Sequence, residues 1–251
     1  MKNLPLLFCG ILLVLVAPWC GLILASNVQY GRLEPGAAED GDPVYPKPAP
    51  GIAEQGRQVY IEMGCVYCHT QQPRPESAEV LLDQTVKTKD GSKVEPVFLS
   101  PDIARGWSKR GSVARDYIYE SRPLLGFMRV GPDLADVGSR SIAAADSDWL
   151  YLHLYDPQIK SPGSVMPPFR FLFTLQKTGD QPASDALMLP ESEPIQPPSG
   201  YDIVPTERAK ILVAYLRSLN LDYDLPEAPL PAAPAAPKAP VVPAAPAASA
   251  K

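Results

Sequence analysis

The sequence is poor in the residues that most often bind metal ions. Its 251 residues include only two histidines and four cysteines. Cys9 and Cys20 lie inside a long apolar run near the N-terminus, where a thiol behaves as a small hydrophobic group. Outside that run, a four-ligand zinc site would need His153 to join the cysteines and histidine of one short motif at residues 65–69. The composition therefore disfavours a structural zinc site.

The sequence also lacks an excess of positive charge. It has 23 Lys and Arg against 28 Asp and Glu, which gives a net charge of -5. No positive field is available to hold a phosphate backbone, so nucleic acid is not an expected partner. Convincing strand alternation and internal repeats are missing too, and we therefore expect a mainly α-helical protein.

No charged residue occurs between Leu4 and Ala25. As a helix, this run would be about 33 Å long, which is enough to cross a bilayer. We expect residues 1–28 to form a single uncleaved transmembrane anchor. The alternative is a cleaved signal peptide, but the apolar run is long for one and no clear A-x-A site follows it. Lys2 precedes the run and acidic residues follow it, so the positive-inside rule places the rest of the chain outside the cytoplasm.

Proline is abundant, with 31 residues against 17 glycines, and its distribution divides the chain. Residues 29–50 and 226–251 are rich in proline, which predicts an extended spacer and a disordered tail. Residues 51–225 between them are expected to fold around one core. Hydrophobic spacing and capping residues predict three helices in this domain, near residues 53–65, 147–156 and 206–220.

Cys65-Val66-Tyr67-Cys68-His69 is the C-x-x-C-H haem attachment motif. Two cysteines three residues apart on a turn can each bond to one vinyl group of a haem, and the next histidine then reaches the iron. A thioredoxin-like C-x-x-C would need a preceding strand, whereas a helix is predicted here. We therefore predict one covalently bound haem c, attached through Cys65 and Cys68 and ligated by His69.

The second axial ligand has five candidates, which are Met63, Met128, Met166, Met188 and His153. Met166 is favoured because the prolines and glycine around it forbid a helix and present the thioether from a stiff loop. His153 is the main rival, although a histidine on an amphipathic helix is more often a hydrogen-bonded structural residue. Met63 is too close to the attachment turn to reach the other haem face. Met128 and Met188 are interpreted as core residues.

Gly131 and Pro132 are predicted to form a turn close to the haem. A backbone carbonyl of such a turn can accept the Nδ1 proton of His69 and so fix the orientation of the ring. Arg74 and Arg129 are candidates for binding the haem propionates, since guanidinium pairs well with carboxylate. The alternative for both arginines is a solvated surface role.

The order of these motifs resembles class I cytochrome c. That resemblance implies that the first and last helices of the domain cross, with Gly56 and Tyr215 at the crossing. Longer blocks, including GRQVYIEMGCVYCHTQQPRP and SPGSVMPPFRF, resemble the mono-haem subunit II of cbb3-type cytochrome c oxidases (FixO/CcoO type). In that family, the residues corresponding to His69 and Met166 ligate the haem.

The resemblance implies a haem domain on the periplasmic side of the bacterial inner membrane, beside the haem-copper catalytic subunit. There the chain would relay electrons from a c-type cytochrome donor, without catalysis of its own. The alternatives are a free-standing anchored cytochrome c, the small subunit of a nitric oxide reductase, and a haem peroxidase or gas sensor. The last class is disfavoured, because a His/Met ligand pair leaves no open coordination site.

Two segments, near residues 80–114 and 174–205, look long for this family. We expect them to be insertions that change the partner surface. Trp107, Lys109 and Arg110 in the first segment are candidates for a docking patch, but a solvated loop is the default expectation.

Overall fold

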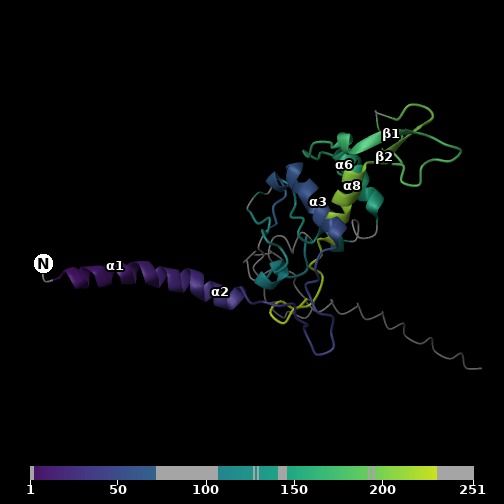
Figure 1. The fold of residues 1–251 in the computed structure, drawn as a ribbon. Helices are drawn as coiled ribbons and strands as arrows, with labels where there is room; N and C mark the ends of the chain where they lie inside the picture. Colours follow the sequence, from purple (N-terminus) through teal and green to yellow (C-terminus); the bar gives the residue numbers. More distant parts are fainter. Residues whose placement is uncertain are drawn as a thin grey trace, which may run out of the picture.

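The computed structural model describes residues 3–71, 107–126, 128, 130–140, 146–191, 193 and 196–230. Over these residues the chain is mainly helical, as the sequence predicts, and one long N-terminal helix projects away from the remaining elements (Figure 1). The rest of the described chain forms a domain built on three helices, α3 (Gly51–Glu62), α6 (Ser147–Tyr155) and α8 (Glu207–Ser218). The short helix α7 (Pro157–Lys160) follows α6.

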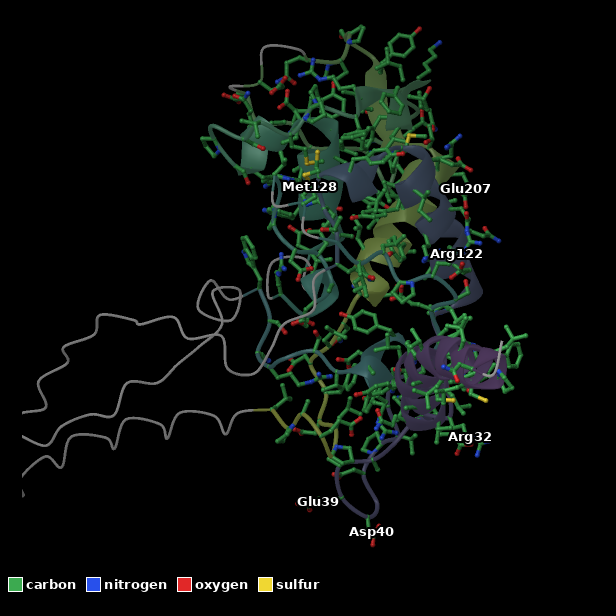
Figure 2. All side chains as sticks on the ribbon, turned by 90° about the vertical axis from the view of Figure 1, so that its left-hand side faces the viewer. Arg32, Glu39, Asp40, Arg122, Met128 and Glu207 are labelled. Carbon is green, nitrogen blue, oxygen red and sulfur yellow. The ribbon has the colours of Figure 1, made fainter. Side chains whose placement is uncertain are left out.

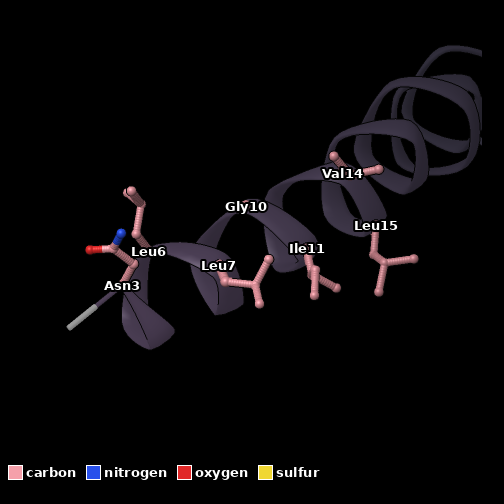
Figure 3. A pocket seen from close by; sticks show the side chains of 7 residues that line it. All are labelled: Asn3, Leu6, Leu7, Gly10, Ile11, Val14 and Leu15. Carbon is pink, nitrogen blue, oxygen red and sulfur yellow. The ribbon is translucent and has the colours of Figure 1, made fainter. Parts of the chain in front are cut away.

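The N-terminal helix consists of α1 (Leu4–Pro18), a π-helical stretch (Trp19–Leu24) and α2 (Ala25–Tyr30). The π-helical pattern begins directly after Pro18, a residue that has no N–H to donate. Together the three segments form a 27-residue helix that contains an 18-residue window with a mean hydropathy of 2.6, so it is long and apolar enough to cross a membrane. One side of α1 carries a groove lined almost wholly by apolar side chains (Figure 3). This helix is consistent with membrane anchoring, and a signal sequence would have the same properties.

Helices α3 and α8 cross in close contact and form the centre of the domain (Figure 1). The crossing is tight because Gly56 has no side chain: a Cβ there would lie 1.9 Å from the carbonyl oxygen of Ile211 and 2.7 Å from the Cβ of Tyr215. Tyr60 and Tyr215 pack their rings together beside this point, 5.3 Å apart. The helix crossing that the cytochrome resemblance implies is therefore present, at the two residues expected.

The ends of the helices follow the capping signals in the sequence. Thr206 accepts a hydrogen bond from the N–H of Ala209 at the start of α8, and Asp146 accepts one from Asp148 at the start of α6. Helix α6 ends before Pro157, which then serves as the first residue of α7.

The described residues also contain one two-stranded sheet, although the sequence shows no convincing strand pattern. β1 (Phe173–Lys177) pairs antiparallel with β2 (Tyr201–Pro205), in a register that sets Phe173 opposite Pro205 and Lys177 opposite Tyr201. β1 buries only its first residue, whereas β2 buries its last three. Neither strand alternates clearly, and the long connection between them offers no hairpin turn signal. The sequence pattern therefore does not predict the pairing of β1 with β2.

The segment expected to be an extended spacer, residues 29–50, folds back on itself near its middle. Gly36 and Tyr45 exchange two backbone hydrogen bonds, and Glu39 and Asp40 lie at the tip of the resulting loop (Figure 2). The ring of Tyr45 stacks on Tyr223 with the ring centroids 4.5 Å apart. At the other end of the domain, Leu225 and Ala228 are buried, so ordered packing continues into the beginning of the segment expected to be a tail.

Candidate haem site

The Cys65–His69 motif lies on a tight turn that continues directly from α3. Gly64 adopts a left-handed conformation after the helix, with φ of 75°, and a 3-10 turn follows over Cys65–Tyr67. The carbonyl of Cys65 accepts hydrogen bonds from the N–H groups of Cys68, at 3.1 Å, and His69, at 2.9 Å. This turn brings the two thiols and the imidazole onto one short stretch of backbone.

Both thiols are free and partly buried. Burial raises the pKa of Cys65 to about 11, so this sulfur is a protonated thiol at neutral pH. It therefore lacks the thiolate character of a redox-active cysteine pair. Two unpaired thiols at this spacing are the arrangement that covalent haem attachment needs.

The turn at residues 131–132 contacts the haem attachment motif and fixes His69. Its Nδ1 lies 2.9 Å from the carbonyl oxygen of Pro132, and the N–H of Gly131 donates to the carbonyl of Cys68 at 3.1 Å. The sequence-based prediction of a hydrogen bond from His69 to this turn is thus met by the structure. Because Nδ1 donates to Pro132, Nε2 is the nitrogen left to bind a metal.

Gly131 has no side chain, and the His69 ring lies in the space that a side chain would fill. A Cβ at this position would be 2.1 Å from Cε1 and 2.5 Å from Nδ1 of the ring. Burial lowers the pKa of His69, while the hydrogen bond to Pro132 acts in the opposite direction. The ring is therefore neutral at physiological pH, the form that ligates iron.

Tyr60 is a part of the site that the sequence analysis did not assign to it. Its hydroxyl donates a hydrogen bond to the backbone carbonyl of His69, while its ring packs on Tyr215 of α8. The helix crossing thus fixes the position of the attachment turn. The sequence feature that could have identified Tyr60 is its position on the apolar face of the predicted helix. A buried tyrosine hydroxyl usually has a hydrogen-bond partner.

Met166 lies in the loop between α7 and the 3-10 turn Arg170–Leu172. Its N–H donates to the hydroxyl of Ser164 at 3.2 Å, and its side chain packs against the main hydrophobic core. The loop is fastened to α6 by a hydrogen bond from the N–H of Phe169 to the carbonyl of Leu154, at 2.8 Å. Met166 is thus presented from an irregular, anchored loop, as expected.

The structure does not bear out the roles expected for several other residues singled out from the sequence. Met128 and Met188 are 47% and 79% exposed, so the interpretation of both as core residues is wrong. Arg74 and Arg129 lie outside the described residues. Arg110 is not part of a solvated loop, because it is 3% exposed and forms a buried ion pair with Asp116. Within the described part of the chain, no group of three or more His, Cys, Asp and Glu residues suits a metal ion.

Part of this domain is similar to a known protein family. Residues 105–190 match the model of the family described as cytochrome C oxidase, mono-heme subunit/FixO. The predicted resemblance is confirmed. The match covers about a third of the chain and includes the 131–132 turn and Met166, whereas the Cys65–His69 motif lies outside it. No curated protein matches the chain.

Two independent observations therefore meet at His69. The attachment motif comes from a segment that the family model does not cover, and the turn that orients its histidine comes from a segment that it does cover. The mono-haem subunit family implies a haem cofactor, and the residues at this site suit one. The thiols are unpaired, the imidazole has Nε2 available, and Gly131 allows the ring to lie against the turn.

Proposed function

We propose that this chain is the membrane-anchored electron-transfer subunit of a cbb3-type cytochrome c oxidase. It has a class I cytochrome c domain with one haem attached through Cys65 and Cys68 and ligated by His69 and Met166. The observation that carries the proposal is the hydrogen bond between His69 and Pro132, at 2.9 Å. It joins the haem attachment motif to the segment that matches the oxidase subunit family.

When bound, the haem supplies an iron centre that changes by one electron. The residues of this chain determine how that centre is held. The Pro132 carbonyl and the Tyr60 hydroxyl fix the ring and the backbone of His69. A thioether from Met166 favours the reduced iron more than a second imidazole would, and a complete ligand set excludes small molecules from the iron. Arg74 and Arg129 remain proposed partners of the propionates.

The proposed location follows from the anchor and from the family. The helix from Leu4 to Tyr30 spans the inner membrane, and the domain from residue 51 onward faces the periplasm. There it receives electrons from a c-type cytochrome and passes them to the haem-copper subunit. The tie between Tyr45 and Tyr223 supports this arrangement, because it holds the domain close to the end of the anchor.

The test is production of the full chain together with the cytochrome c maturation machinery. Wild-type protein should carry one porphyrin, visible as a mass increase that survives denaturation, and Cys65→Ala/Cys68→Ala should lose it. In detergent extracts of the cells that make this protein naturally, the wild-type chain should copurify with a haem-copper protein. A colourless wild-type chain without added mass overturns haem attachment. A coloured chain that purifies by itself supports a free-standing cytochrome instead.

A further inference from the structure

Arg170 lies directly after the Met166 loop, and the proposed function does not yet use its contacts. Its Nη2 donates to Oδ2 of Asp156 at 2.5 Å and to Oε1 of Glu193 at 3.1 Å. Its guanidinium also lies over the ring of Tyr155, 5.2 Å from the ring centroid. One side chain therefore joins the C-terminal end of α6 to the long connection between β1 and β2.

The ion pair with Asp156 closes the stretch of chain that carries Met166. Asp156 lies directly before α7, where its other carboxylate oxygen accepts a hydrogen bond from a backbone N–H of that helix. Arg170 is the first residue of the 3-10 turn that follows the loop. Beside the ion pair, the N–H of Phe169 donates to the carbonyl of Leu154 at 2.8 Å. A side-chain contact and a backbone contact thus hold the two ends of the loop together.

Glu193 adds a brace from the connection between β1 and β2, one of the two segments that look like insertions. Its side chain is only 6% exposed, and a buried carboxylate needs a partner of opposite charge, which Arg170 supplies. The backbone around Glu193 is fastened as well, because the side-chain amide of Gln196 donates to the carbonyls of Pro190 and Glu193, at 2.9 and 3.0 Å. This segment, expected to change the partner surface, therefore also reaches the end of the Met166 loop.

We propose that Arg170 is a positioning residue for the proposed Met166 ligand: its two ion pairs keep the loop closed and so hold the thioether at the haem iron. The proposal rests on the proposed function, since it assumes a haem with Met166 as an axial ligand. The prolines and the glycine of this loop are exposed, and a loop of this kind opens at a low free energy. Arg170 raises the free energy of opening, because its two charge-assisted hydrogen bonds must break first.

The experiment uses the full, haem-loaded chain in its oxidised form and adds imidazole. Imidazole can replace the thioether only when the loop opens, so the rate at which the far-red band of the iron–sulfur bond disappears measures the opening. Arg170→Gln should bind imidazole at least about tenfold faster than the wild type, because both charged hydrogen bonds are lost. Glu193→Gln removes the brace alone and should give a smaller acceleration. Arg170→Lys should fall between Arg170→Gln and the wild type, because lysine keeps the charge without the planar fork.

Asp185→Asn is the matched control. It removes an exposed ion pair, at 2.7 Å, between the same β1–β2 connection and Lys210 of α8, so imidazole binding should keep the wild-type rate. Hydrogen exchange gives a readout that does not need the haem. In Arg170→Gln, the backbone N–H groups of residues 161–169 should exchange faster, while those of α3 and α8 should exchange as in the wild type.

A wild-type imidazole rate in Arg170→Gln would overturn the proposal, even if the loop exchanged faster. Equal acceleration of exchange in the loop, α3 and α8 would overturn it too, because Arg170 would then stabilise the domain as a whole. If Arg170→Gln does not fold, wild-type imidazole rates in both Arg170→Lys and Glu193→Gln would have the same meaning. A wild-type chain without porphyrin would refute the proposed function itself, and hydrogen exchange would still measure the clamp on the loop.

Discussion

Gly131 shows how a single residue sets the geometry of the candidate site. The Cβ added by Gly131→Ala would overlap the His69 ring, at 2.1 Å from Cε1. Either the ring or the turn must move, and the hydrogen bond between His69 and Pro132 would be lost. We expect a loss of about 1–3 kcal/mol of stability, which is typical of overpacking. In the haem-loaded chain we also expect a weaker far-red absorption band from the proposed bond between the iron and the Met166 sulfur. Thermal unfolding and optical spectra of the loaded chain would measure both.

Gly179→Ala is the matched control for Gly131→Ala. Gly179 also lies in a loop, and a Cβ there would meet only the carbonyl oxygen of Gln181, at 3.8 Å. That distance is ordinary van der Waals contact, so we expect wild-type stability and spectra. Equal behaviour of the two variants would mean that the close approach at Gly131 does not constrain His69.

Glu120 should make the stability of the domain depend on pH. Burial raises its pKa above the ordinary 4.5, against the smaller opposing effects of its hydrogen bond with Gln71 and the charge of Arg57. The folded state therefore holds this proton more tightly than the unfolded state, so stability falls as pH rises above about 4.5. Glu120→Gln should remove this trend and leave the domain more stable than wild type at neutral pH. Urea unfolding between about pH 4 and pH 7 measures the difference. Glu39→Gln, at the exposed tip of the loop, should follow the wild-type trend (Figure 2).

At the scale of elements, the crossing of α3 and α8 depends on one glycine. Alanine is the better helix former by about 1 kcal/mol, so propensity by itself would make Gly56→Ala stabilising. The packing predicts the opposite sign, because a Cβ would lie 1.9 Å from a backbone oxygen that cannot rotate away. We expect a net loss of about 1–3 kcal/mol and a fall of several degrees in melting temperature. On the same helix, Gly51→Ala meets nothing within 4 Å and should be close to neutral.

The elements also show what a sequence can and cannot predict. Helices α6 and α8 carry their own capping residues, so they were predictable from local signals. Pro132 is 63 residues from His69, and its contact with His69 was predictable only because a haem-ligating histidine needs a hydrogen-bond acceptor for its Nδ1. The pairing of β1 with β2 was not predictable, because each strand is stabilised by a partner more than twenty residues away. The same is true of Arg110, whose burial depends on Tyr223, 113 residues further along the chain.

For the whole molecule, a second small core ties the segment that follows the N-terminal helix to the domain. It consists of Ala135, Leu221, Tyr223 and Leu225, with Tyr45 and Val113 packed against it. Beside it, Arg115 forms an ion pair with Glu227 at 2.5 Å and donates to the carbonyl of Glu34. Three segments distant in sequence therefore meet here: the chain that follows the anchor, the residues after position 106, and the C-terminal end of the described chain. The meeting point limits how far the domain can move from the N-terminal helix.

The centre of this meeting point is the ion pair of Arg110 and Asp116. Two nitrogens of Arg110 donate to the two carboxylate oxygens at 3.0 and 2.8 Å, Tyr223 donates its hydroxyl to the same carboxylate, and neither charged side chain is exposed. Asp116→Asn would leave the charge of Arg110 buried without its partner, at a cost of about 3–5 kcal/mol. The loss should free the segment around residues 36–46, so limited proteolysis should cut there faster than in wild type. Asp222→Asn removes only the exposed pair with Lys109 and should cost less than about 1 kcal/mol. If both variants resist protease as the wild type does, the buried pair does not hold the segment around residues 36–46 to the domain.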